Sequence, residues 1–151
     1  MHGNAHSSND SDAPPRPFTQ SWADALRAVI NGNADYRSVA GGWRWPIALV
    51  LERAPDLGYP DDVAIRLELE AGDCHDARLV APDDADAPFV LRGAYGVWKR
   101  IVRGELDAIA AVVTQELALE GRLHTLVMHA RWAKALVACA RQVPTAFPDE
   151  A

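Results

Sequence analysis

Residues 89–136, FVLRGAYGVWKRIVRGELDAIAAVVTQELALEGRLHTLVMHARWAKAL, decide the fold because they alternate short apolar strands with helices. Phe89–Arg92 predicts a strand, and Ala94–Arg103 predicts an amphipathic helix with its apolar side chains on one half of the circumference. Asp107 is expected to cap a second helix rich in Ala and Val, and Glu116–Glu120 predicts another strand. Nothing in this stretch indicates a catalytic centre.

The same stretch leads into a long helix, predicted over residues 125–141, that is more apolar than docking on a sheet requires. Its apolar residues cover about 220° of the circumference, whereas a stripe of about 100° suffices for docking. Such a helix covers the sheet and also a second helix, a partner subunit or a ligand. Arg131, Lys134 and Arg141 share the polar face. They contact either solvent, which is the commoner use of such charges, or an anionic head group or membrane surface.

The preceding residues predict the rest of the sheet. A helix is expected to start at Ser21 and to stop at residues 31–33, Asn-Gly-Asn. Residues 45–52 form an apolar run typical of a strand covered on both faces, and residues 63–70 alternate as a strand with one wet face. Residues 74–81 read as the hairpin partner of that strand. We therefore expect one α+β domain with a five-stranded, mostly antiparallel sheet and helices packed on one face.

Composition narrows the class of protein. The chain has 151 residues, 49% of them hydrophobic, and a net charge of −6, which argues against a nucleic-acid partner. No apolar run reaches the ~18 residues that span a bilayer, so we expect no stable membrane insertion. Residues 1–18 are expected to be a disordered tail, 19–143 the folded domain and 144–151 a flexible tail. The two cysteines are far apart in the sequence, which favours free thiols and a cytoplasmic location.

The sequence predicts neither an enzyme nor a metal or cofactor site. His124 and His129 are five residues apart and do not share a helix face, while Cys74 and His75 point to opposite faces of a strand. Every serine lies within the first 38 residues, and none stands in a nucleophile elbow. His129 falls in the apolar arc of the last helix, where it either contacts a ligand or bonds a backbone carbonyl; we favour the carbonyl.

The order and spacing of four motifs resemble the sterol carrier protein type 2 family, over about residues 20–141. The motifs are Asn31–Arg37 followed by Trp43, Leu67–Gly72 followed by Ala77-Arg78, Phe89–Gly93 leading to Trp98 and Gly104–Asp107, and Leu117–Gly121. The resemblance implies a five-stranded sheet with helices over one face, an apolar tunnel between them and the C-terminal helix as a wall or lid. It also implies a non-catalytic carrier of sterols, fatty acids or acyl chains.

On this basis we predict that the chain is a stand-alone, bacterial-style lipid carrier whose partner is an apolar, lipid-like small molecule. Nine residues are predicted to line its tunnel: Trp98, Ile101, Val102, Val112, Val113, Leu117, Leu119, Met128 and Trp132. The alternative is a homodimer or accessory interaction module with a filled core, in which Met128, Trp132 and Cys139 bury against a second copy or a partner.

Overall fold

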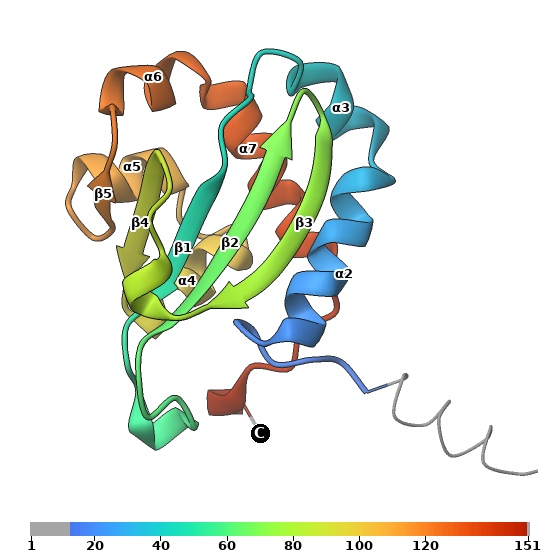
Figure 1. Cartoon of the computed structure of the whole chain (residues 1–151). Coiled ribbons are helices and arrows are strands. Elements are labelled where there is room, and N and C mark those ends of the chain that lie inside the picture. Colours follow the sequence, from blue (N-terminus) through green and yellow to red (C-terminus); the bar gives the residue numbers. More distant parts are fainter. Residues whose placement is uncertain (1–12, 151) are drawn as a thin grey trace, which may run out of the picture.

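The structure, a computed structural model, describes residues 13–150. These residues form a five-stranded sheet with the strand order β3-β2-β1-β4-β5 (Figure 1). The central strand β1 (Ile47–Leu51) pairs antiparallel with β2 (Val63–Glu70) and parallel with β4 (Phe89–Gly93). The edge strands β3 (Asp73–Val80) and β5 (Ala118–Glu120) pair antiparallel with β2 and β4. The expected α+β class and mostly antiparallel sheet are confirmed, with one parallel pair at the centre.

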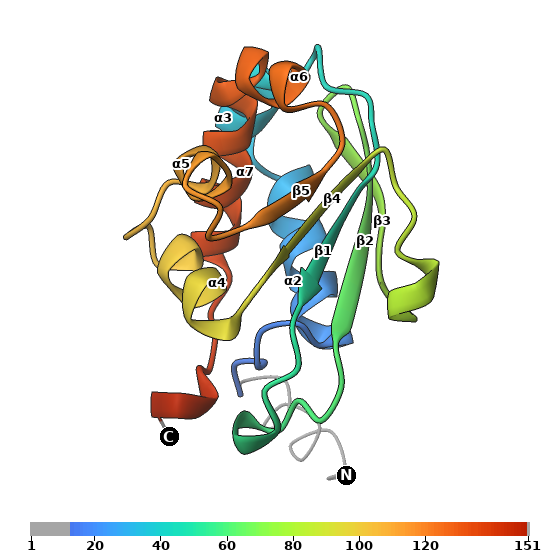
Figure 2. The ribbon, with the colours of Figure 1, turned by 90° about the vertical axis from the view of Figure 1, so that its left-hand side faces the viewer.

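The helices lie on one face of this sheet (Figure 2). The loop between β3 and β4, which contains the short 3-10 helix η2 (Pro82–Asp84), lies on the other side. No helix in residues 13–150 is long and apolar enough to cross a bilayer. The helices are α2 (Gln20–Asn31), α3 (Ala34–Val39), α4 (Tyr95–Val102), α5 (Ala108–Val113), α6 (Leu123–Met128) and α7 (Ala130–Gln142), with 3-10 helices η1 (Pro55–Leu57) and η3 (Pro148–Glu150).

Polar side chains cap the first turns of α2 and α5. Asp107 caps α5, as expected, because its carboxylate accepts a hydrogen bond from the Ala110 N–H at 2.9 Å. The predicted start at Ser21 is wrong: Thr19 is the N-cap of α2, and its hydroxyl accepts from the Trp22 N–H at 3.2 Å. Both residues are good caps. In the structure α2 begins at Gln20, directly after the extended backbone of Thr19.

The strand β1 is buried on both faces along its whole length, as its unbroken apolar run indicated. One face meets the helices. On the other, Ala48 and Val50 join Ala64 and Val90 in a small second cluster covered by the loop after β3. Small side chains suffice there because the loop lies close to the sheet. The main core, and any space within it, is therefore on the helix side.

The long final helix predicted over residues 125–141 is wrong, because the chain breaks into α6 and α7 at His129. The backbone of His129 leaves the helical region at φ −110° and ψ 35°. Its ring Nδ1 lies 2.9 Å from the Thr125 carbonyl oxygen, and the ring packs edge-on against Trp43. The sequence alternative in which His129 bonds a backbone carbonyl is the one observed.

Segments expected to be tails make definite contacts. Phe18 is buried, and the Pro17 carbonyl accepts a hydrogen bond from the Tyr59 hydroxyl at 2.6 Å. At the other end, Thr145 accepts from the Trp22 indole N–H at 3.0 Å, and Asp149 pairs with Lys99 at 2.9 Å. The folded body therefore extends beyond residues 19–143 in both directions. Residues 1–12 of the predicted disordered tail lie outside the described residues.

Gly121, at the turn between β5 and α6, offers a test of the fold. Its φ of +135° is accessible to little but glycine, and an added Cβ would stand 2.6 Å from the Pro88 carbonyl oxygen. Gly121→Ala is therefore expected to lower the free energy of unfolding by about 1–3 kcal/mol from backbone strain alone, measured by chemical denaturation.

Gly96→Ala is the matched control, because Gly96 lies in α4 and a Cβ there meets nothing within 4 Å. It should raise the stability by up to about 1 kcal/mol. Equal effects of the two substitutions would contradict the turn geometry.

Candidate functional site

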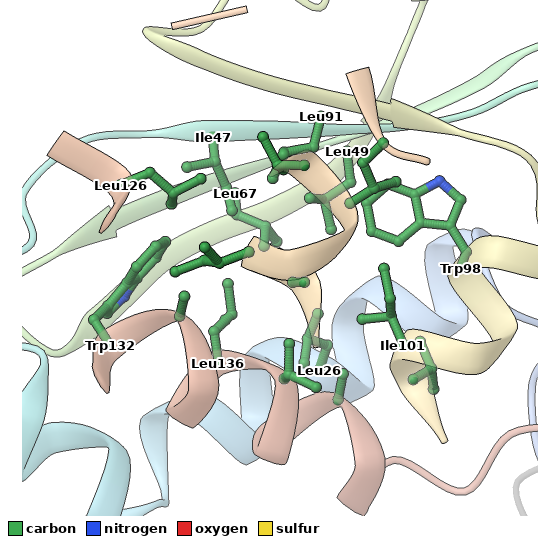
Figure 3. A pocket seen from close by; sticks show the side chains of 18 of the residues that line it. Leu26, Ile47, Leu49, Leu67, Leu91, Trp98, Ile101, Leu126, Trp132 and Leu136 are labelled. Carbon is green, nitrogen blue, oxygen red and sulfur yellow. The ribbon is translucent and has the colours of Figure 1, made fainter. Parts of the chain in front are cut away.

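An apolar cavity of about 70 Å³ lies between the sheet and the helices α2, α4, α5, α6 and α7 (Figure 3). The sheet forms one wall of the cavity through four aliphatic side chains. Ile47 pairs in register with Leu67 of β2, and Leu49 pairs with Leu91 of β4. Because residues two apart on a strand share a face, these pairs place four neighbouring side chains on the helix side. The cavity thus lies against the central, most deeply buried part of the sheet.

Helix α4 closes one end of the cavity with Trp98, Ile101 and Val102, all buried. Their spacing puts them on one face of the helix, as the amphipathic pattern indicated. The Trp98 indole N–H donates to the Val50 carbonyl oxygen at 3.0 Å, and its ring contacts Phe18 with centroids 5.4 Å apart. The indole is therefore held by both the sheet and the N-terminal segment.

Trp132 of α7 closes the opposite end (Figure 3). Its ring stacks on Trp43 with centroids 3.6 Å apart and an interplanar angle of 6°. Its indole N–H donates to the Tyr36 hydroxyl at 2.9 Å. Trp43 in turn contacts Phe89, at 4.9 Å between centroids, so one aromatic cluster joins α3, α7 and the sheet.

The cavity wall offers no free polar group. Its lining side chains are apolar or tryptophan, and the three indole N–H groups of Trp22, Trp98 and Trp132 all donate within the protein. An apolar space of this kind stays dry, since water needs two to four polar partners. Neither a charged substrate nor a polar reaction can be accommodated there without a large desolvation cost. What this site can do chemically is hold an apolar group.

Six of the nine predicted residues line the cavity, and three do not. Those in the lining are Trp98, Ile101, Val102, Val112, Leu117 and Trp132. Val113 is 62% exposed because adjacent helical positions point 100° apart, and Val112 takes the inward one. Met128 is 69% exposed because the break at His129 changes the direction of the chain. Leu119 packs against the core, opposite Leu91, but outside the cavity lining.

The prediction missed the contributions of the sheet and of α2. Ile47, Leu49 and Leu67 line the cavity, as do Trp22 and Leu26 of α2. The period-two alternation of β2 and the helical spacing of Trp22 and Leu26 were visible in the sequence. They indicated buried faces, but nothing in them distinguished residues beside a void from residues in filled core.

The buried titratable side chains lie beside the cavity rather than in it. Burial raises the pKa of Cys139, on α7, and of Cys74, on β3, from 9.0 to about 11. Burial likewise raises the pKa of Tyr36 to about 12, against the opposing effect of its hydrogen bond from Trp132. These groups are neutral at physiological pH. Within residues 13–150 no three His, Cys, Asp or Glu side chains are grouped so as to hold a metal ion.

Comparison with solved structures identifies the family. A crystal structure of sterol carrier protein 2 shares 32% sequence identity with this chain at a TM-score of 0.80, covering 85% of this chain and 99% of the other. The solution structure of a possible sterol carrier protein from Thermus thermophilus shares 31% identity at a TM-score of 0.81, covering 89% and 94%. Sterol carrier protein 2 from Yarrowia lipolytica, in its apo form, shares the fold at 18% identity and a TM-score of 0.55, covering 79% and 88%.

This chain therefore belongs to the sterol carrier protein 2 family, as its four motifs indicated. Neither the models of known protein families nor the curated proteins give a match to it.

The buried thiols provide a test of the packing around α7 and β3. Cys74 and Cys139 are expected to react slowly with Ellman's reagent in the native protein at about pH 8, because the thiolate is the nucleophile and burial suppresses it. Unfolding in guanidinium should restore fast reaction of both.

The raised pKa values of Cys74 and Cys139 also determine how the stability of the protein changes with pH. Thiols of the unfolded chain ionise first, so the free energy of unfolding falls as the pH rises from about 9 toward about 11. Rapid labelling of the native protein, or stability that increases over this range, would contradict the burial.

Proposed function

We propose that this chain is a non-catalytic carrier that binds an apolar or amphipathic lipid, such as a sterol, a fatty acid or another acyl chain, between its sheet and its helices. The observation that carries the proposal is the apolar cavity whose wall presents no free hydrogen-bonding group. Each 100 Å² of acyl chain buried there contributes about 2.5 kcal/mol, so binding needs no polar anchor inside. Membership of the sterol carrier protein 2 family supports the same function.

The small volume of the cavity limits what it can bind without a change of shape. The cavity of about 70 Å³ is smaller than the ~150 Å³ space that accepts benzene. A lipid chain therefore enters only if part of the wall moves outward. Helix α5 is the element suited to this movement, because it has six residues and lies between left-handed residues at Gly104 (φ 77°) and Gln115 (φ 66°).

The homodimeric alternative needs Trp132, Met128 and Cys139 at an interface. Trp132 and Cys139 are buried within the chain, and only Met128 is exposed. This burial favours the carrier over a dimer built on α7. The two free, buried thiols further support a reducing compartment such as the cytoplasm.

The test measures binding of cis-parinaric acid and of dehydroergosterol by energy transfer from the tryptophans that line the cavity, Trp22, Trp98 and Trp132. Saturable binding of at least one probe is expected. Ala140→Leu adds three carbons to a side chain that lines the cavity, and it should lower the affinity by about tenfold or more, since displaced lipid carbons lose ~0.8 kcal/mol each.

Ala110→Leu is the matched control, because Ala110 lies on the exposed side of α5. It should leave binding unchanged. Absence of saturable binding by either probe, with the fold intact by circular dichroism, would refute the carrier. Equal effects of the two substitutions would place the ligand elsewhere.

A further inference from the structure

A second hollow, of about 270 Å³, opens to solvent on the outer side of the cavity wall. We call it the α5–α7 groove. Along α7 it is lined by Lys134, Val137, Ala138 and Arg141, whose spacing places them on one face of the helix. The turn from Gly104 to Asp107 and the start of α5 form its other side.

The α5–α7 groove and the cavity share a wall. Four residues line both spaces: Ala108 and Ile109 of α5, and Ala133 and Val137 of α7. Two of the four are alanines, so the partition between the two spaces is thin. Three further surface hollows, at β2–β3, at the C-terminal segment and at α2–α3, share no lining residue with the cavity. Of these four hollows, the α5–α7 groove is therefore the one that borders the cavity.

The charge of the groove is opposite to that of the chain. The chain carries a net charge of −6, yet residues 121–142 contain four Lys or Arg and no Asp or Glu. Within the described part of the chain, neither Lys134 nor Arg141 forms a salt bridge, whereas neighbouring Lys99, Arg100 and Arg103 all pair with carboxylates. The two groove cations are thus available to an external anion.

The groove also contains one acidic side chain, Asp107, and its carboxylate is used as the N-cap of α5. Arg141 crosses the turn at Gly104: a Cβ on that glycine would lie 2.6 Å from the Arg141 Cζ. The missing side chain gives the guanidinium room to lie over the turn, at the edge of the groove.

We propose that the α5–α7 groove is the entrance to the cavity and that it binds the carboxylate of a long-chain fatty acid through Lys134 and Arg141. This inference rests on the proposed carrier function. The cavity has no polar group to receive a carboxylate, and burying an unpaired charge is costly, so an amphiphile enters chain first and leaves its head group outside. Two cations without carboxylate partners stand where that head group remains.

The experiment compares palmitate with hexadecan-1-ol, which has the same chain length and no charge, by displacement of the neutral dye Nile red. The test variant is Lys134→Gln/Arg141→Gln. It should weaken palmitate binding by about tenfold, because two charge-assisted contacts are lost, and change hexadecanol binding less than about twofold. In the unmodified protein the palmitate affinity should fall with added salt, and this dependence should disappear in the variant.

The control variant Arg44→Gln/Arg122→Gln changes the net charge by the same amount at two exposed positions outside the groove. It should leave both affinities unchanged. If the unmodified protein binds both compounds and the test variant retains its preference for palmitate, the entrance proposal is overturned while the carrier stands. A loss of palmitate binding as large in the control would also overturn it. If neither compound displaces the dye, the carrier function itself fails, and the entrance proposal with it.

Discussion

The stacked rings of Trp132 and Trp43 hold the N-terminal end of α7 against the sheet. Such an aromatic pair contributes about 0.5–1.5 kcal/mol beyond the area that it buries. Its geometry is further restrained by the hydrogen bond from Trp132 to Tyr36. At the other end of α7 the chain continues into Thr145, which accepts a hydrogen bond from Trp22 of α2. Helix α7 is thus fastened near both ends, and Trp132 and Trp22, which make these contacts, both line the cavity.

The same contacts distinguish the parts of the cavity wall that are held by hydrogen bonds from the parts that are not. The Trp98 indole donates to a backbone carbonyl and the Trp132 indole to a buried hydroxyl. The strand β1 is paired along its whole length with β2 and with β4. Helix α5 has six residues, and its Ala108 and Ile109 line both the cavity and the α5–α7 groove. For the proposed entry of a lipid, α5 is therefore the part of the wall that we expect to move.

Local sequence patterns predicted most of the fold because helix and strand periodicities are set by neighbouring residues. The amphipathic α4, the cap at Asp107, the double-sided burial of β1 and the alternation of β2 were all visible in this way. The break at His129 was not, and there the imidazole ring packs against Trp43, a contact between residues distant in the sequence that local patterns do not reveal. The misplacement of Met128 follows directly from that one break.

By itself, the sequence determined the α+β class, the apolar faces of the elements and the family, since each of these depends on residue order and spacing. It also indicated that the last segment carries more apolar surface than a sheet alone requires. Only the tertiary structure decided which of those side chains face a void and which of the basic residues lie beside it. A void is the difference between the space that the backbones enclose and the volume of all the side chains that enter it, and those side chains come from strands and helices spread along the whole described chain. The groove at Lys134 and Arg141 likewise exists only where α5 and α7 meet.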